Sequence, residues 1–329
     1  MINQFRTLNP INIFFLVIMS ILLRSGIFLH LPENLNFDFP GVLKSLSNGM
    51  PNDLFLSPVS NVIIAGLLVV IQALILNKVI NSHNIFGKPT FLPALMYITV
   101  ASIFIPFMVL NPVIISNFLV IWMINKFLSI YHRHEIGSVM YDLGMIVGVG
   151  TLIYFPFISM MPLLWISLVI FRPFNWREWI ATLIGFITIY FCLGVFYFMN
   201  DSLGQFFQIW LPLANQFPKE FNVNGYHYTV LVPVIIIMVL SALSLSENFF
   251  RSAILVRKTI QLLFFMFILA MGSCYLLSKV ELYHFSFGLA PASIFMAYYF
   301  YNAKKRWLYE SLYALLLVFI IYFQIFLGL

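Results

Sequence analysis

Residues 59–77 read VSNVIIAGLLVVIQALILN, nineteen residues without a charged side chain. A helix of about 20 mostly apolar residues is long enough to cross roughly 30 Å of hydrocarbon. The apolar residues are continuous and lack the alternation of a membrane barrel strand, and in lipid the backbone must satisfy its own hydrogen bonds. The stretch therefore predicts a membrane-spanning α-helix.

The rest of the chain has the same character. Of 329 residues, 62% are hydrophobic and 9% are charged, whereas soluble domains are usually about 45–50% apolar and about 25% charged. We expect eleven spans, at residues 10–29, 59–77, 91–110, 113–131, 139–157, 160–171, 178–199, 228–244, 260–278, 284–301 and 308–327. The predicted fold is an all-α, polytopic transmembrane helical bundle that forms a single integral-membrane domain over residues 1–329. Its longest outer loops are 30–58 and 200–227.

Positive charge predicts the orientation. Alternate segments between the spans carry 13 Lys and Arg on one side and 3 on the other. Cytoplasmic loops keep the positive charge, so the N-terminus is expected in the cytoplasm and the C-terminus outside, in a multi-pass protein of a bacterial inner membrane. Because the basic residues are scattered over the loops, they indicate topology and no nucleic-acid partner.

The region 139–171 is the weakest part of the span count. It holds only about 33 residues for two spans, and Pro156 and Pro162 interrupt it. One span here would invert every later loop and place the cluster Lys304-Lys305-Arg306 outside. We therefore expect two short helices, either crossing fully or returning to the same side.

The stretch FRPFNWREW at 171–179 is dense in charge and tryptophan. Pro173 disfavours helix at the residue before it, and Asn175 with Glu178 three residues later fits a capping box. We interpret the stretch as a cytoplasmic turn and an interfacial helix start. Arg172 and Arg177 can contact lipid phosphate there, and the sharper alternative is an anion site beside the helix N-terminus.

A second polar stretch, residues 131–142, precedes the fifth span. An acid that enters lipid normally finds a partner, so Asp142 is expected in a buried ion pair, with Arg133 as the first candidate and Arg172 or Arg177 as alternatives. His132 and His134 with Glu135 give only part of a metal site. No metal or cofactor is expected, and Cys192 and Cys274 fit buried apolar positions.

Arg24 is the basic residue expected deep in a span. It lies about 14 residues, or about 21 Å, from the predicted inner start of its helix, which is the outer half of the bilayer. It can snorkel outward, bind an anionic lipid headgroup or pair with an acid of the following loop. A polyprenyl-phosphate donor needs a cation for its phosphate, and sugar transfer needs a carboxylate base. Asp38 or Asp53 is the candidate base, with Arg24 on the phosphate.

The stretches YHRHEIGSVMYDLG at 131–144 and FRPFNWREW, with the cluster Lys304-Lys305-Arg306, resemble those of a family of polytopic inner-membrane proteins from Bacteroidota. The resemblance covers the whole chain. The family has no established biochemical function, so it implies no site residues. Some members carry the label beta-carotene monooxygenase, but such enzymes hold iron with four histidines, and here six histidines divide evenly between the two sides.

Three functions remain open. The first is an enzyme of envelope glycoconjugate assembly that handles polyprenyl phosphate at its outer face. The second is a transporter or flippase, although few ionisable residues lie in the spans. The third is a non-catalytic membrane scaffold subunit bound to a membrane-protein partner. Membrane lipids are the expected partners in each.

Overall fold

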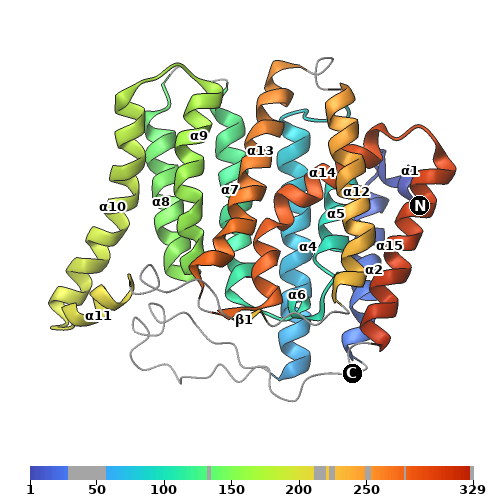
Figure 1. The fold of residues 1–329 in the computed structure, drawn as a ribbon, viewed down its shortest axis with the longest axis horizontal. Coiled ribbons are helices and arrows are strands. Elements are labelled where there is room, and N and C mark those ends of the chain that lie inside the picture. The colour runs from blue at the N-terminus through green and yellow to red at the C-terminus, as the bar shows by residue number, and fades with distance from the viewer. Residues whose placement is uncertain are drawn as a thin grey trace.

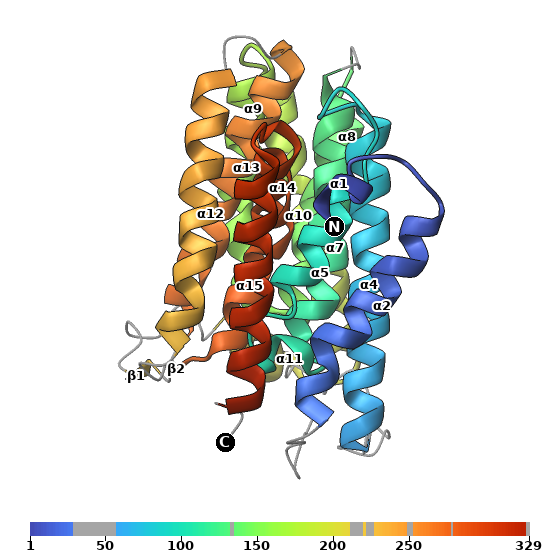
Figure 2. The ribbon, with the colours of Figure 1, turned by 90° about the vertical axis from the view of Figure 1, so that its right-hand side faces the viewer.

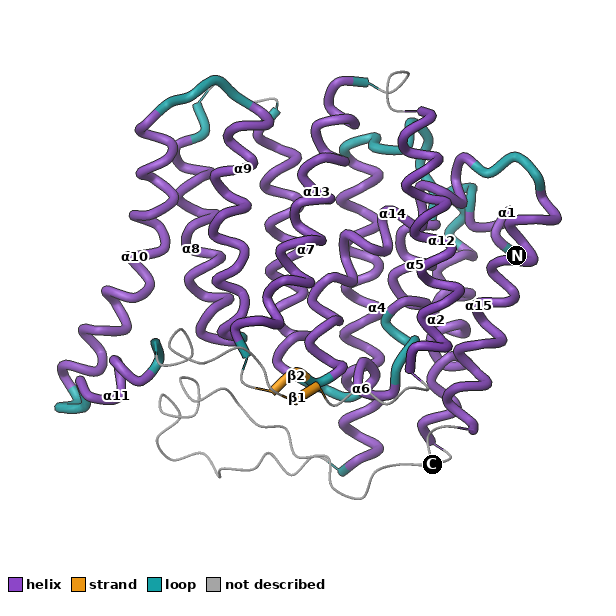
Figure 3. Tube along the Cα trace, viewed as in Figure 1, coloured by secondary structure: helices purple, strands orange, loops and turns teal. Residues whose placement is uncertain are grey.

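The computed structural model describes residues 1–28, 57–131, 135–210, 220–221, 227–248, 253–277 and 279–326. They form a bundle of helices that run up and down along one common direction (Figures 1 and 3). The elements are α1 (Ile2–Phe5), α2 (Ile11–Arg24), η1 (Ser25–Phe28), α4 (Pro58–Ser82), α5 (Leu92–Val100), α6 (Ile105–Met108), α7 (Pro112–Ile130), α8 (Gly137–Ile153), η2 (Phe155–Met160), α9 (Met161–Phe171), α10 (Trp176–Met199), α11 (Leu203–Gln208), β1 (Glu220–Phe221), α12 (His227–Asn248), α13 (Ile254–Gly272), η5 (Ser273–Leu276), β2 (Lys279–Val280), η6 (Leu282–Gly288), α14 (Leu289–Asn302) and α15 (Arg306–Phe326).

Each of the eleven predicted runs contains helix, which confirms an all-helical membrane bundle. Only one pair of two-residue strands, β1 and β2, accompanies the helices in the described part, and it is parallel. Within the described residues, six segments are long and apolar enough to cross a membrane: Ile11–Phe28, Pro58–Ser82, Pro112–Ile130, Trp176–Met199, Ile254–Leu276 and Arg306–Gln324. The chain is therefore a membrane protein.

The region 139–171 folds as two helices. α8 ends at Ile153, Tyr154 is extended (φ −144°, ψ 104°), and η2 leads into α9. Pro156 and Pro162 lie at the first positions of η2 and α9, where a missing N–H costs least. The two-helix prediction is thus confirmed against a single span.

Two runs expected as continuous spans, 91–110 and 284–301, are not continuous α-helices. After α5 the chain reaches Phe104, which is extended (φ −117°, ψ 145°), before the short α6. Pro106 explains the break, because it has no N–H to bond the carbonyl four residues earlier. The run 284–301 begins as the 3-10 helix η6 and becomes α14. Hydropathy alone did not reveal these breaks.

The interrupted helices lie at the centre of the bundle. All nine residues of α5 and the first twelve of α14 are buried, and the two helices pack on each other, on α4 and on α12. Exposed polar backbone is not tolerated in hydrocarbon, so an interruption needs partners. Buried amide side chains supply them: Gln324 donates to the Ser102 carbonyl (3.0 Å) and Asn117 to the Ser286 carbonyl (3.0 Å). Gln72 of α4 also donates to a carbonyl of the neighbouring helix α7, that of Ile114 (2.6 Å).

Helices α8 and α10 cross in direct backbone contact. A Cβ added to Gly144 would lie 2.1 Å from the Thr182 carbonyl oxygen, and one added to Gly185 would lie 2.1 Å from the Tyr141 carbonyl oxygen. Small residues permit such close approach between membrane helices.

Basic residues gather at one end of the bundle. The α9–α10 turn, the α14–α15 turn and the start of α13 lie there, while α11 and the strand pair lie at the opposite end (Figure 1). We call the first the basic end. Arg6 donates to the Phe300 and Ala303 carbonyls beside the α14–α15 turn, and Lys258 of α13 donates to the Phe171 carbonyl.

Candidate functional site: a groove between α2 and α4

Helices α2 and α4 lie side by side at one edge of the bundle (Figure 2). Between them is a cavity of about 510 Å³. Its rim is apolar and outward-facing, since Ile21 is 64% exposed, Ile63 55% and Leu67 57%. The surroundings of such a surface in a membrane protein are lipid chains, so the groove opens to lipid.

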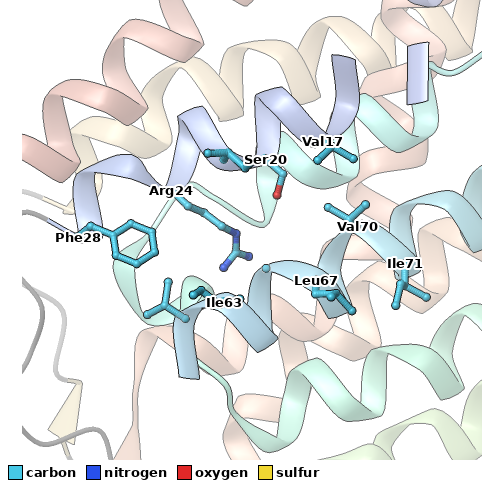
Figure 4. Close-up of a pocket in the computed structure, with 11 residues that line it drawn as sticks. Val17, Ser20, Arg24, Phe28, Ile63, Leu67, Val70 and Ile71 are labelled. Atoms are coloured by element: carbon cyan, nitrogen blue, oxygen red, sulfur yellow. The ribbon is translucent and has the colours of Figure 1, made fainter. Parts of the chain in front are cut away.

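Arg24 forms the floor of this groove. Its side chain is only 4% exposed and points from the end of α2 toward α4, as does the hydroxyl of Ser20 (Figure 4). Nη1 donates a hydrogen bond of 2.9 Å to the Met108 carbonyl oxygen at the end of α6. Arg24 therefore does not snorkel to the surface.

The other edge of the guanidinium is free. Nε and Nη2 are buried and have no hydrogen-bond partner. These two nitrogens lie on one side of the planar group, the side that binds a carboxylate or phosphate through two parallel hydrogen bonds. The three ion pairs between described residues involve other cations.

A further unpaired donor, on Asn61 of α4, lies near the end of α6. The Oδ1 atom of Asn61 accepts from the Leu110 N–H at 2.7 Å, two residues beyond the carbonyl that Arg24 binds. Its Nδ2 atom is buried without a partner. The unsatisfied groups around the end of α6 are thus donors, which favours an acceptor-rich ligand.

Gly66 on α4 makes room for the cation. A Cβ at this position would lie 3.3 Å from Arg24 Cδ and 3.5 Å from Nε. The arginine therefore packs against the α4 backbone, and a side chain at position 66 would push it. A desolvated cation with a free edge, in a groove open to lipid, is suited to an anionic lipid headgroup.

The candidate bases Asp38 and Asp53 lie outside the described residues, within the gap between 28 and 57. Their placement relative to Arg24 stays a prediction.

The turn at 171–179 uses its arginines locally. Arg172 lies 3.6 Å from the carboxylate of Glu178, and Arg177 lies over the Trp176 ring at 5.9 Å. Asn175 caps α10 by accepting from the Arg177 N–H, as expected. Trp179 stacks on Trp165 of α9 at 6.3 Å. Because the two guanidinium groups contact different neighbours, this geometry favours an anchoring turn over an anion site.

Asp142 pairs with Lys126 on α7 at 2.7 Å. Its side chain is 44% exposed, so the expectation of a buried acid was wrong: residue 142 is in the second turn of α8, close to its polar end. The predicted partner Arg133 lies outside the described residues. Antiparallel packing of α7 and α8 brings Lys126 close to Asp142. The position of Lys126 near the end of the predicted span 113–131 could have indicated this pair in the sequence.

Among the described residues, no group of three or more His, Cys, Asp and Glu could hold a metal ion. In comparison with known proteins, residues 54–328 match a family described as "Family of unknown function (DUF6427)". No curated protein and no solved structure matches. Helix α4 and everything after it lie inside the matched region, whereas α2 and Arg24 precede it.

Proposed function

We propose that this chain, which belongs to the DUF6427 family, is a multi-pass inner-membrane protein that handles polyprenyl-phosphate lipid in envelope glycoconjugate assembly. The observation that carries the proposal is the free Nε–Nη2 edge of Arg24, buried in a groove that opens to lipid. Arg24 binds the lipid phosphate, and the groove between α2 and α4 takes the first part of the chain.

The shape of the groove supports a single-chain lipid. Its lining runs along α2 from Arg24 back to Val17, about 10 Å at 1.5 Å per residue. A narrow slot between two helices suits one unbranched chain below a headgroup better than two chains side by side. A phosphate also has enough oxygens to accept from both free nitrogens of Arg24.

The proposed topology places this groove in the outer leaflet. With eleven crossings, the basic end is cytoplasmic and the C-terminus is extracytoplasmic. The sequence count of basic residues and their gathering in the α9–α10 and α14–α15 turns support this arrangement. We also propose that the chain comes from a member of the Bacteroidota.

The chemical step we propose is glycosyl transfer at the outer face. Asp38 or Asp53, in the loop that directly follows Arg24, removes the proton from the acceptor hydroxyl as the phosphate leaves. Proximity in sequence to the phosphate-binding residue supports these two acids.

A binding measurement tests the first half of this function. The protein is reconstituted in nanodiscs and titrated with polyprenyl monophosphate, with phosphatidic acid and phosphatidylglycerol as two-chain competitors. Binding should be lost in Arg24→Ala and kept in the matched control Arg177→Ala, which removes an exposed arginine. Equal binding in both variants would refute the site.

The acids are tested separately. Asp38→Asn and Asp53→Asn should retain the lipid, while one of them loses sugar transfer in membranes supplied with lipid-linked sugar. Retained transfer in both variants would exclude these bases and leave lipid binding in place.

A second candidate function is lipid transport. The interruption between α5 and α6 favours it, because transporter substrate sites often lie between broken helices. Movement of a labelled lipid between leaflets, dependent on Arg24 and indifferent to both acids, would select this function.

A further inference from the structure

A second cavity lies inside the bundle, beside the interrupted helices. It has a volume of about 460 Å³ and is enclosed by α5–α6, α12, α13 and η6–α14. Helix α6 belongs to both sites, since its Met108 carbonyl binds Arg24 and its Phe107 side chain lines this cavity.

The walls of this cavity are apolar. Aromatic and thioether side chains make up much of the lining: Phe104, Phe107, Met238, Phe267, Met271 and Phe285. The backbone carbonyls at the interruptions, Ser102 and Ser286, are already bonded by Gln324 and Asn117. The lining offers a polar ligand few partners, and a water molecule needs two to four polar neighbours.

The cavity reaches the outer face of the bundle at α12, and we call this side its mouth. Helix α12 packs on α14 and α15, whereas α13 packs on α9, η2 and η6, and α14 is seen between the two (Figure 1). Val234 and Met238 on α12 line the cavity and are partly exposed, while their neighbours Val232 and Ile235 are 51% and 56% exposed. The medium at this mouth is the hydrocarbon of the bilayer.

We propose that this cavity takes up one hydrocarbon chain of a membrane lipid, which enters sideways between α12 and α13 and ends against α5–α6. Methionine side chains at the wall can adjust to such a chain, and the volume is in the range of small-molecule sites, about 300–1,000 Å³. The site goes beyond the proposed function, because it uses no charge and, apart from α6, lies on other helices.

Photo-crosslinking tests the proposal. The full chain is reconstituted in vesicles of phosphatidylglycerol with a diazirine in the middle of one acyl chain, and adducts are mapped by mass spectrometry. Phe104 and Phe107 are only 3% and 4% exposed, so adducts on them require a chain inside the cavity. Ile235 on the outer face should be labelled in every sample and serves as the internal control.

A second probe identifies the source of the chain. The same vesicles receive a diazirine-tagged polyprenyl phosphate in place of the labelled phospholipid. Labelling of Phe104 or Phe107 by the first probe assigns an acyl chain, and labelling by the second alone assigns a prenyl chain. Neither probe reaching these residues, with Ile235 labelled, would overturn the proposal.

A matched pair of variants tests the entry path. Val234→Trp fills the mouth and should reduce labelling of α5–α6 about tenfold, because the larger side chain takes up the space through which the lipid chain enters. Val232→Trp adds the same bulk on the lipid face and should leave labelling unchanged. Equal labelling in the two variants would contradict entry between α12 and α13. Arg24→Ala should leave this labelling unchanged. Loss of phosphate binding in Arg24→Ala therefore tests the proposed function and not this cavity.

Discussion

Replacing Arg24 with Met distinguishes a structural role of the guanidinium from a ligand-binding role. Methionine keeps an unbranched apolar stem like that of arginine and has a similar helix propensity. In protein freed of lipid, the wild type has one hydrogen bond from Arg24 to the Met108 carbonyl and two buried nitrogens without partners. A hydrogen bond from a charged donor contributes about 1.5–3 kcal/mol, while burial of an ion costs several kcal/mol. Arg24→Met should therefore raise the free energy of unfolding by about 0–2 kcal/mol.

Ligand should reverse this order of stability. Binding to the folded state adds about 2.7 kcal/mol when the ligand is present at 100 times its Kd, and only the wild type should gain it. The assay is reversible unfolding in lipid-free detergent, with and without polyprenyl phosphate. Arg24→Lys is the control, because it keeps the charge and loses the two-nitrogen edge. A lipid-free variant that is about 2–3 kcal/mol less stable, beside a wild type that ignores the lipid, would refute the reasoning.

Three further predictions concern the fold and its orientation. Gly144→Ala should destabilise the protein by about 1–3 kcal/mol, because the new Cβ would meet a carbonyl oxygen of α10 at 2.1 Å. The control in the same unfolding assay is Gly137→Ala, where an added Cβ meets nothing within 4 Å. Equal effects of the two substitutions would contradict the close crossing of α8 and α10. Gln72→Met should cost about 1–3 kcal/mol, since it leaves a buried carbonyl and a buried tyrosine hydroxyl without their partner; unchanged stability would show that these groups find other partners. In a variant without the native cysteines, Lys279→Cys should react with an impermeant maleimide added outside the cell, and Lys304→Cys should react only after permeabilisation. The reverse result would show that the topology is opposite to the proposed one.

Hydropathy predicts where the helices are in this chain, because each apolar run must form internal hydrogen bonds in lipid. It does not predict whether a run is continuous. The run 91–110 is interrupted around Phe104, and its cue is a single proline, Pro106, which many membrane helices tolerate. The break is stabilised by Gln324, a contact between residues 222 positions apart. Such distant pairs are not evident in one sequence.

The sequence singles out Arg24 but not its contacts. Counting residues from the start of the first run predicts Arg24 in the outer half of the bilayer, and this depth stays a prediction. Its partner, the Met108 carbonyl, lies 84 positions away in the sequence. This carbonyl is available as an acceptor because α6 ends at Met108. Gly66 contributes by lacking a side chain, which no pattern of residue types reveals. Lys126 was within reach of prediction, since it and Asp142 flank the same turn.

Native mass spectrometry of the protein, extracted gently from its own membrane, tests the central claim most directly. We predict that the wild type retains a phosphate lipid with one prenyl chain, and that Arg24→Ala loses it while Arg177→Ala keeps it. A wild type without lipid would contradict the account. A lipid that is retained in Arg24→Ala and lost in Arg172→Ala would also contradict it, and would place the anion site at the turn at 171–179.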